Sequence, residues 1–512
     1  MRPHGAPAMS RHVTVRLSSG AVRGRRLDGY QSFQGIPYAA PPVGERRWRA
    51  PAPVEPWTGV RDATEPAGPA PQPAQPFAAA SLDEDCLTLD VTVPDAAPPA
   101  QGAGRPVIIW LHGGGGTNGG SAGFDPHRLA AAGGAVVVAP NARLGVLACF
   151  GHPGLADGGT FGLQDQQAAL RWVRREIARF GGDPGRVALV GSSYGALMIA
   201  AHLVSPASAG LFHRAILQSP FSVLGATPAH TLIPGVPALP PRWIPAAELE
   251  RFGAATAAEH GWTAPGDDPE AALARLRRVP VAELLQATDA FIRPAYGGAT
   301  LPESPGTALP AGRFHRMPVM LGTTLDEARF FVGLFAELAG RPVTAEGYPR
   351  LLAEAFGGAA AEIARHYPLD RFPTPGLAWA QISTDRAWAR PTWELGRALA
   401  EHTGTWLYEF ADRDAPQPVP LPGFPAGACH AGELAYQFDL PGAPPLPAAQ
   451  RGLADRMNRY WAAFAAHGEP AGAGLPDWPG FETGHVQSLA PEHIGGTDYA
   501  AEHRLDLWER MP

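Results

Sequence analysis

The sequence contains little cysteine and no lysine. Its 512 residues include three cysteines, Cys86, Cys149 and Cys429, which are too few and too scattered for a disulfide framework or a thiolate metal site. We expect buried or idle thiols, since free cysteine packs as a small hydrophobic residue. All 41 basic residues are arginine, and with 61 glycines and 57 prolines this indicates a composition bias from which no function follows.

Charge of either sign is also sparse. Charged residues make up 17% of the chain and the formal net charge is −7, whereas soluble proteins usually contain about 25% charged residues. The charges are scattered, without a basic block or an acidic tail. Nucleic acid and anionic membrane surfaces are therefore not expected as partners.

Long apolar runs are missing as well. None reaches the ~18 residues of a membrane span, and the N-terminal stretch MRPHGAPAMSRHVTVRL has no apolar signal-peptide core. We therefore expect a cytoplasmic protein that does not bind membranes. Residues 1–12 are predicted to be a flexible N-terminus, and residues 13–508 a single domain.

Short apolar runs, in contrast, recur along the chain. Four of them predict buried strands: 107–111 (VIIWL), 135–139 (AVVVA), 187–190 (VALV) and 215–217 (AIL). Between the second and the third, Leu163, Leu170, Val173, Ile177 and Phe180 recur at helical spacing, and Gly181 with Pro184 ends that element. Strands alternating with helices predict an α/β fold with a mostly parallel sheet covered on both faces.

Other segments fit around this sheet. A second amphipathic helix is predicted from Leu453, Met457, Trp461 and Phe464. Proline-rich segments at 66–76, 227–245 and 415–425 are interpreted as surface loops or cap insertions on one large domain.

One of the strand predictions carries a motif. Residues 187–203 (VALVGSSYGALMIAAHL) follow the order strand, sharp turn, helix, which the G-x-S-x-G nucleophile elbow requires. The residues two before and two after the nucleophile approach neighbouring backbone and must be small, so glycine suits both places. Centring the motif on Ser193 meets this condition, whereas centring it on Ser192 puts Val190 and Tyr194 there. Ser193 is the predicted nucleophile and Ser192 its neighbour.

A glycine-rich loop follows the first predicted strand. His112 and four glycines, 113–116, come directly after 107–111. A phosphate-binding loop is one alternative, but no Gly-Lys-Ser/Thr follows and His112 does not fit it. An oxyanion hole formed by backbone N–H groups matches an HGGG loop after a strand. A merely flexible loop remains the other alternative.

Further segments in chain order make the sequence resemble the type-B carboxylesterases, from the carboxylesterase/cholinesterase group of α/β-hydrolases. These segments are 33–39 (FQGIPYA), 41–44 (PPVG), 47–48 (RW), 84–89 (EDCLTL), 141–145 (NARLG), 162–166 (GLQDQ), 180–184 (FGGDP), 205–206 (SP), 210–215 (GLFHRA), 218–219 (QS), 459–461 (RYW) and 477–479 (DWP). The resemblance implies an α/β-hydrolase fold with a central, mostly parallel twisted sheet, helices on both faces and cap insertions.

The resemblance also implies the partners of Ser193. The family's D-E-G segment corresponds to residues 326–328 (DEA), which makes Glu327 the triad acid. Its G-x-x-H segment, followed shortly by glutamate, corresponds to Gly427 through His430 with Glu433 after it, which makes His430 the general base. The order Ser, Glu, His agrees with that of α/β-hydrolases.

The implied activity is that of a serine carboxylesterase acting on a small-molecule ester through an acyl-enzyme. The backbone amides of Gly114, Gly115 and Tyr194 would hold the oxyanion, and no metal or other cofactor is expected. Because the base must be neutral, activity is expected to rise near the ~6.5 of an unperturbed histidine.

Some positions depart from the family pattern. Ser192 stands where glutamate usually precedes the nucleophile, Tyr194 where alanine follows it, Gly116 where an aromatic residue ends the oxyanion loop, and Ala328 in place of the D-E-G glycine. These departures keep two alternatives open. One is a biosynthetic acyl transferase or cyclase that uses the same acyl-enzyme, and the other is a non-catalytic scaffold on the same fold.

The substrate pocket is predicted from position alone. Its candidate residues lie near the motifs or in the proline-rich insertion, and core packing is the alternative role for the aromatic ones: Gly116, Ser192, Phe221, Trp243, Phe291, Phe330 and Phe331. An aromatic, uncharged pocket would favour an apolar or aryl ester over a charged one.

Two ion pairs and one cysteine are also implied by the resemblance. Arg143 with Asp165 and Arg47 with Glu84 are expected to join core segments, since a buried charge must be paired. Cys86 is the first cysteine of the chain, so the disulfide of secreted family members to an earlier cysteine cannot form within it.

Overall fold

The computed structural model describes residues 11–75, 78–95, 104–224, 233–234, 236, 238, 240–417 and 419–511. Strand β1 begins at His12, within the segment predicted to be flexible, while residues 1–10 lie outside the described residues. Much of the predicted loop at 227–245 also lies outside them. The single domain over 13–508 stays a prediction.

Thirteen strands of the described chain form one sheet, in the order β1-β2-β3-β5-β7-β6-β8-β9-β12-β13-β14-β15 with β4 beside β2. The strands are β1 His12–Arg16, β2 Ala21–Leu27, β3 Tyr30–Pro37, β4 Val60–Asp62, β5 Thr88–Pro94, β6 Arg105–Leu111, β7 Val136–Pro140, β8 Gly182–Ser192, β9 Arg214–Gln218, β12 Val319–Thr324, β13 Thr405–Phe410, β14 Val486–Leu489 and β15 Ile494–Gly496. The two remaining strands, β10 Ile244–Pro245 and β11 Ala295–Tyr296, form a small parallel pair. The four predicted strands correspond to β6, β7, β8 and β9, which confirms them.

The sheet is parallel from β7 to β14 and antiparallel at its two ends. The central parts of its inner strands are continuously apolar. Because successive side chains of a strand point to opposite faces, alternate residues enter two different cores. Ile109, Leu189 and Leu217 belong to one cluster, and Ile108, Val190 and Ile216 to the other. A sheet buried on both faces needs such continuous apolar strands.

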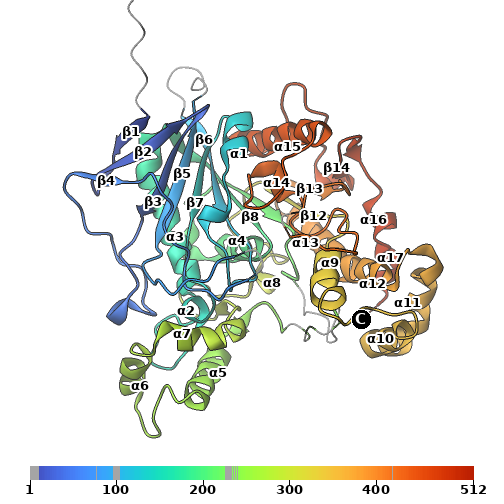
Figure 1. Cartoon of the computed structure of the whole chain (residues 1–512), viewed down its shortest axis with the longest axis horizontal. Coiled ribbons are helices and arrows are strands. Elements are labelled where there is room, and N and C mark those ends of the chain that lie inside the picture. The colour runs from blue at the N-terminus through green and yellow to red at the C-terminus, as the bar shows by residue number, and fades with distance from the viewer. Residues whose placement is uncertain are drawn as a thin grey trace, which may run out of the picture.

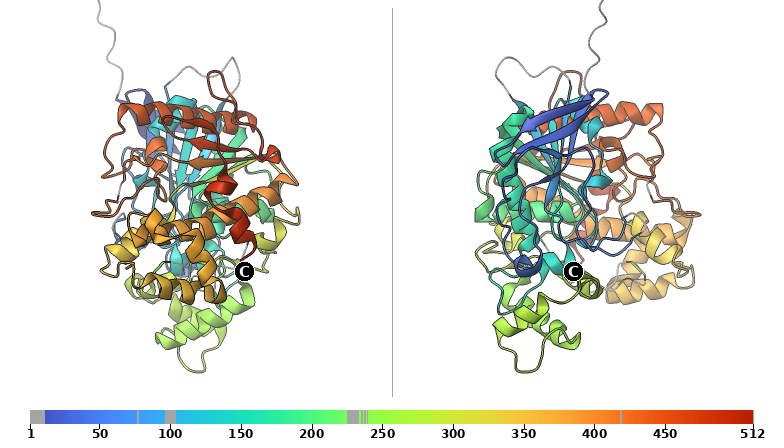
Figure 2. Two further views of the ribbon diagram at one scale, coloured as in Figure 1. Left: turned by 90° about the vertical axis from the view of Figure 1, so that its right-hand side faces the viewer. Right: turned by 60° about the vertical axis from the view of Figure 1, so that its left-hand side comes forward.

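Helices cover both faces of the sheet, as the right-hand view of Figure 2 shows. The α-helices are α1 His127–Gly133, α2 Gly145–Cys149, α3 Phe161–Glu176, α4 Tyr194–Val204, α5 Ala246–Glu259, α6 Pro269–Leu276, α7 Val281–Leu284, α8 Pro305–Ala308, α9 Ala328–Val332, α10 Tyr348–Phe356, α11 Ala360–His366, α12 Pro375–Thr384, α13 Arg390–Ala400, α14 Leu434–Gln437, α15 Ala448–His467, α16 Tyr499–Glu502 and α17 Leu505–Glu509. Short 3₁₀ turns are η1 Gly44–Arg46, η2 Ser121–Gly123, η3 Ile177–Phe180, η4 Pro206–Ser208, η5 Leu285–Ala290, η7 Gly357–Ala359, η8 Leu369–Arg371 and η10 Phe481–Thr483, and π turns are η6 Gly333–Glu337 and η9 Asp385–Ala389.

The helices divide between the two cores. Helices α3, α4 and α13 pack on one face and α1, α14 and α15 on the other. The two predicted amphipathic helices are confirmed as α3, which continues into η3, and α15. Helices α5 to α7 project from one end of the molecule, and α10 and α11 form a second projecting group (Figure 1). The expected architecture, a mostly parallel sheet with helices on both faces and inserted helices, is confirmed.

The carboxyl ends of the parallel strands meet at one edge of the sheet. The HGGGG loop follows β6, Ser193 follows β8, Ser219 follows β9 and Glu327 follows β12. The register pairs Leu111 with Gly191, and Ser192 with Gln218. Parallel pairing therefore brings together segments that lie far apart in the sequence.

Candidate active site

Ser193 occupies a strained turn between β8 and α4. Its φ of 57° and ψ of −117° lie in a region that residues other than glycine rarely adopt. Its N–H donates to the carbonyl oxygen of Gln218 at 2.8 Å, which fixes the turn against the end of β9. This is the strand-turn-helix geometry that the motif requires.

The two glycines of the motif are needed for steric reasons. A Cβ at Gly195 would lie 2.1 Å from the carbonyl oxygen of Leu111, and a Cβ at Gly191 would lie 2.8 Å from the carbonyl carbon of Gly195. Both distances are far below van der Waals contact. The elbow therefore closes only when neither position carries a side chain.

The glycine-rich loop lies directly against the nucleophile turn. A Cβ at Gly113 would lie 3.0 Å from the carbonyl oxygen of Ser192 and 3.2 Å from Cβ of Ser193. Gly114, Gly115 and Gly116 all have positive φ, at 94°, 65° and 82°. The structure therefore brings this loop and Ser193 together, in a backbone conformation that favours glycine.

Helix α4 begins at Tyr194, so the N–H groups of its first turn have no acceptor within the helix. Among the described residues, the N–H groups of Gly114 and Gly115 have no backbone or side-chain acceptor either. The end of the glycine loop and the start of α4 thus leave amide donors open beside Ser193.

Glu327, which follows β12, forms a buried pair with His430. Nδ1 of His430 lies 2.5 Å from Oε2 of Glu327, and both side chains are buried. Oε1 of Glu327 accepts from the Ser219 hydroxyl at 2.5 Å and from the Thr324 N–H at 3.0 Å. The carboxylate is held by three donors, so its orientation toward the imidazole is fixed.

Asp326 ties the two loops of this pair together. Its N–H donates to the Ala428 carbonyl at 2.9 Å, and its own carboxylate accepts from the Ala428 N–H at 3.1 Å. Arg329 and Arg413 pair with the same carboxylate at 2.8 and 2.9 Å. His430 also donates its backbone N–H to the carbonyl of Glu327 at 3.2 Å. The acid and the histidine are therefore positioned by main chain as well as by side chains.

The electrostatics of the pair favour a protonated imidazole. Burial lowers the pKa of His430, but the adjacent Glu327 carboxylate raises it by more, so the net pKa lies above the usual 6.5. A second carboxyl group, Glu433, is fully buried nearby, and burial followed by the Glu327 charge raises its pKa to about 7. Its Oε1 accepts from Gln218 at 3.1 Å, whereas its Oε2 has no partner among the described residues.

Of the two neighbours of Ser193 in sequence, Ser192 is buried and Tyr194 is half-buried. The Ser192 hydroxyl is buried without a hydrogen-bond partner in the described part of the chain. The Tyr194 ring packs beside Gly116, where a Cβ would lie 2.6 Å from it. The ring thus occupies space that a side chain at position 116 would need. These two departures from the family pattern are sterically linked. The aromatic ring at position 194 leaves no room for a side chain at position 116.

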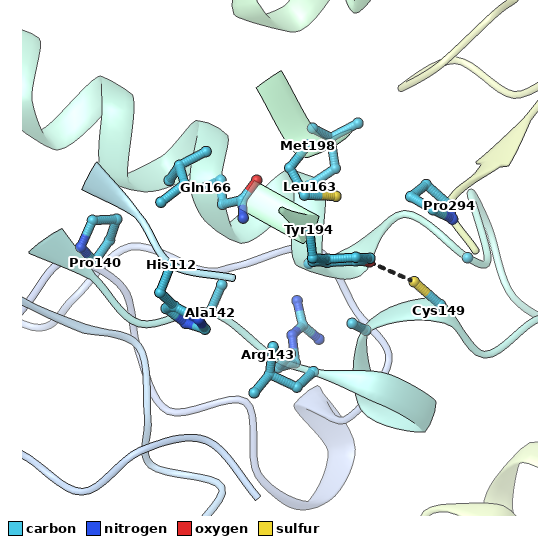
Figure 3. Close-up of a pocket in the computed structure, with 15 residues that line it drawn as sticks. His112, Pro140, Ala142, Arg143, Cys149, Leu163, Gln166, Tyr194, Met198 and Pro294 are labelled. Atoms are coloured by element: carbon cyan, nitrogen blue, oxygen red, sulfur yellow. Dashed lines mark hydrogen bonds between the residues drawn. The ribbon is translucent and has the colours of Figure 1, made fainter. Parts of the chain in front are cut away.

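Figure 3 shows the Tyr194 hydroxyl facing Cys149, at 3.8 Å from its sulfur. The ring borders a cavity of about 20 Å³, lined also by His112, Arg143 and Pro294. Such a volume holds about one water molecule. This cavity is therefore too small to hold an ester.

Aromatic side chains gather around the imidazole. The Phe331 and Phe330 rings lie 5.0 and 6.4 Å from that of His430, centroid to centroid. Trp388, in the π turn η9, lies 6.3 Å from His430 and 4.8 Å from Phe221. The structure thus brings three of the predicted pocket residues into one group with His430. π turns inside helices often mark functional sites.

Two other predicted pocket residues are packed in core clusters. Phe291 is fully buried in a separate core cluster and packs 5.1 Å from Phe150 and 5.2 Å from Phe252. Trp243 is buried, and its indole N–H donates to the Val223 carbonyl at 2.9 Å. Core packing therefore accounts for the environment of both rings.

The sequence prediction missed three residues at this site. Ser219 lies in the 218–219 segment, whose position after a strand was the available signal. Trp388 is far from any motif, so nothing in the sequence marked it. Arg242 places its guanidinium carbon 5.1 Å from the centre of the Phe221 ring. A cation from the proline-rich insertion thus lies against this ring. The aromatic, uncharged pocket stays a prediction.

The expected ion pairs are confirmed. Asp165 binds Nε and Nη2 of Arg143 at 2.7 and 2.6 Å, and Glu84 binds Arg47 in the same two-point manner. The three cysteines all lie in the described chain and are buried and unbridged, as expected.

Metal-binding clusters and membrane-spanning helices are both missing from the described residues. These residues contain no cluster of three or more His, Cys, Asp or Glu side chains arranged to hold a metal ion. None of their helices has the length and apolar character that crossing a membrane requires. The cytoplasmic location stays a prediction.

Comparison with known proteins agrees with this geometry. The model of the Carboxylesterase family matches residues 11–508. The chain is 30% identical to para-nitrobenzyl esterase of Bacillus subtilis (strain 168), over 97% of this chain and 99% of the relative. It is 33% identical to fumonisin B1 esterase of Sphingopyxis macrogoltabida, over 93% and 85%, and 31% identical to cocaine esterase of Oryctolagus cuniculus, over 91% and 89%. A solved structure of PNB esterase superposes with a TM-score of 0.75 at 31% identity, covering 97% of this chain and 100% of that one.

Proposed function

The chain belongs to the carboxylesterase family and is a carboxylic ester hydrolase, and on this premise we propose that Ser193, His430 and Glu327 form its catalytic triad. The single observation that carries the assignment is the buried hydrogen bond of 2.5 Å between Nδ1 of His430 and Oε2 of Glu327. It leaves Nε2 as the ring nitrogen that can act on a hydroxyl.

The reaction has two halves. Nε2 of His430 takes the proton of Ser193 as Oγ attacks the acyl carbonyl, and the imidazolium then protonates the departing alcohol. Water next attacks the acyl-enzyme with His430 again acting as base, which releases the acid and restores Ser193. Glu327 orients the ring and stabilises its charged form, and its other oxygen is held by Ser219 and Thr324.

The oxyanion would be held by main-chain donors. The N–H groups of Gly114 and Gly115 and that of Tyr194 at the start of α4 are the candidates. The close approach of Gly113 to Ser193 supports this role, since it places the loop beside the attacking oxygen. Tyr194 acts here through its backbone, and its ring fills the space beside Gly116.

The hydrogen bond between nucleophile and base is the part of the triad that the structure lacks. No such bond joins the Ser193 hydroxyl to His430 in the described residues. Catalytic hydrogen bonds are often long or poorly aligned without substrate and tighten in the complex. We expect Ser193 Oγ to engage Nε2 when an ester is bound.

Labelling and kinetics test the triad. A fluorophosphonate should modify Ser193 in the folded protein, and Ser193→Ala should lose labelling and reduce kcat on a short 4-nitrophenyl ester by about 10⁴-fold or more. Ser192→Ala is the matched control, because it alters the adjacent hydroxyl, and it should keep labelling at Ser193. Full activity of Ser193→Ala would disprove the assignment.

A further inference from the structure

The small parallel pair β10–β11 brings two arginines together. Ile244 pairs with Ala295, and Pro245 with Tyr296. Arg242 and Arg293 each stand two residues before one of the paired residues Ile244 and Ala295. Their charges interact, since the Arg293 charge helps to lower the pKa of Arg242. Two like charges near each other are destabilising unless something compensates them.

Arg242 has few partners of its own. One guanidinium nitrogen donates to the Pro240 carbonyl at 3.3 Å, and the guanidinium lies over the Phe221 ring at 5.1 Å. Nε is buried and has no hydrogen-bond partner among the described residues. In the same part of the chain, neither Arg242 nor Arg293 forms an ion pair with a carboxylate. The acid that acts on Arg293 is Glu248, which does not contribute at Arg242.

The rest of the chain offers Arg242 no counter-ion. Residues 221–247 contain no aspartate or glutamate, and none of the residues outside the described ranges is acidic. Burial, followed by the charge of Arg293, lowers the pKa of Arg242 to about 10, so the side chain is still charged at neutral pH. Arg242 is half-buried with its Nε fully buried. A partly buried charge without a counter-ion costs free energy, which the Pro240 carbonyl and the Phe221 ring offset only in part.

A chain of ring contacts links Arg242 to the proposed triad. Its guanidinium covers Phe221, whose ring contacts Trp388 at 4.8 Å, and Trp388 in turn lies 6.3 Å from His430. The Arg242 charge also interacts with the phenol of Tyr194, the residue after the nucleophile. The cavity that borders the Tyr194 ring is too small for an ester. We therefore expect a bound ester to lie along Trp388 and Phe221, toward Arg242.

We propose that Arg242 and Arg293 form a cationic subsite that binds a carboxylate carried by the ester substrate. The subsite depends on the proposed function, because its ligand is the substrate of the same Ser193. Guanidinium groups bind planar carboxylates through two parallel hydrogen bonds, for which Nε and a terminal nitrogen of Arg242 are suited. The substrate class is then an ester that carries a free carboxylate on its acyl or its alcohol half: water cleaves the ester bond, and the acid and the alcohol are released while the free carboxylate is unchanged.

Matched pairs of esters test the subsite. On the acyl side, 4-nitrophenyl hydrogen adipate is compared with 4-nitrophenyl heptanoate, and on the alcohol side 3-carboxyphenyl butyrate with phenyl butyrate. The readout is the ratio of kcat/KM for the charged over the neutral ester, because a general loss of folded enzyme lowers both rates alike. We expect a ratio above one in at least one pair, and the pair that shows it tells which half of the ester carries the carboxylate.

Substitutions of the arginines then test whether these residues cause the preference for the charged ester. Arg242→Met should lower the ratio by about 10- to 100-fold, the effect of a lost charge-assisted hydrogen bond, while Arg242→Lys should restore part of it. Arg293→Met should lower it less. Arg350→Met is the control, because Arg350 is an exposed arginine of α10 and its loss should leave the ratio unchanged.

If Arg242→Met does not fold, inhibition of the wild-type enzyme tests the subsite instead. Adipate should compete with the neutral ester, and neutral 1,6-hexanediol should not.

Each failure has a separate meaning. A wild-type ratio at or below one in both pairs, or a ratio that Arg242→Met and Arg293→Met leave intact, would overturn the subsite. The proposed function would still stand if hydrolysis of the neutral esters required Ser193. Hydrolysis that survives Ser193→Ala would instead overturn the triad, whatever the charge preference.

Discussion

His430 and Glu327 are 103 residues apart in the sequence and share a buried hydrogen bond of 2.5 Å. The pair is embedded between Ser219, which donates to the far oxygen of the carboxylate, and Phe331, whose ring lies 5.0 Å from the imidazole. The Glu327 carboxylate fixes the tautomer of this imidazole, and the negative charge of the carboxylate shifts the protonation equilibrium of the ring.

Activity should depend on pH through this imidazole. The proposed base His430 must be neutral to accept a proton. Burial lowers the pKa of His430, but the Glu327 and Glu433 carboxylates together raise it above 6.5. Lowering the pH through that raised pKa protonates the ring and removes activity, so the midpoint of kcat/KM on a neutral ester should lie above the value expected from sequence alone. A profile measured between about pH 5 and pH 9 reports the free enzyme. A midpoint at or below 6.5 would contradict the expectation.

Glu433→Gln should move this midpoint. The Glu433 charge helps to raise the pKa of His430, and the carboxyl itself titrates at about 7. Removing the charge should lower the midpoint by about half a pH unit, with fluorophosphonate labelling of Ser193 retained. Glu492→Gln, at an exposed position, serves as the control with an unchanged midpoint. An unshifted midpoint in Glu433→Gln would show that its charge does not act on His430.

Gly195→Ala should disrupt the nucleophile turn. The new Cβ would lie 2.1 Å from the Leu111 carbonyl oxygen, so the backbone must move. We expect a loss of about 3 kcal/mol in the free energy of unfolding and loss of fluorophosphonate labelling. Gly452→Ala is a matched control, because that glycine is exposed in α15 with open space around it. It should stabilise the protein by about 0.5–1 kcal/mol. Normal labelling of Gly195→Ala would refute the steric argument.

Gly116 and Tyr194 should be coupled in a double-mutant cycle. Tyr194→Ala leaves a cavity and should cost about 3–5 kcal/mol in unfolding free energy. Gly116→Ala should also destabilise, since its Cβ would lie 2.6 Å from the ring and its φ is 82°. The double variant should lose less than the sum of the two by about 1–3 kcal/mol, because the clash disappears with the ring. Strict additivity in urea unfolding would show that the two positions are independent.

His503 should stabilise the folded state by tying its own segment to Asp385 and Glu409. Its ring nitrogens bind Asp385 at 2.7 Å and Glu409 at 2.5 Å, and all three side chains are buried. Burial lowers the pKa of His503, but the two carboxylates outweigh it and raise the pKa to about 10. His503→Gln should lower the free energy of unfolding by about 3–5 kcal/mol near neutral pH, because it removes the ion-pair partner of Glu409 and leaves Asp385 paired with Arg504.

The pH dependence of this effect has a definite sign. A histidine whose pKa is raised in the folded state contributes stability that is fully present below its usual 6.5 and is lost as pH rises through about 10. The difference in unfolding free energy between the wild type and His503→Gln should therefore shrink from about pH 6 to about pH 10. A difference that stays constant over this range would rule out a charged His503. His485→Gln, on a partly buried histidine that bonds the neutral Gln487, gives the comparison.

Much of the fold could be predicted because its signals are local. Apolar runs such as 107–111 need no distant partner to be identified as buried strands, and the glycines around Ser193 follow from the tightness of one turn. The positions of Glu327 and His430 came from the family resemblance, since no spacing rule connects residues on different loops.

Contacts between distant segments could not be predicted in this way. Trp388 reaches His430 because its π turn packs against Ala328 and Phe331 of α9. Arg242 reaches Phe221 across 21 positions of the chain, a contact that no local pattern marks. The sequence by itself determined which segments become strands, helices and the tight turn, because these depend on neighbouring residues. Only the tertiary structure decided which charge faces which ring and which acid faces which base, because those energies depend on distances through space rather than along the chain.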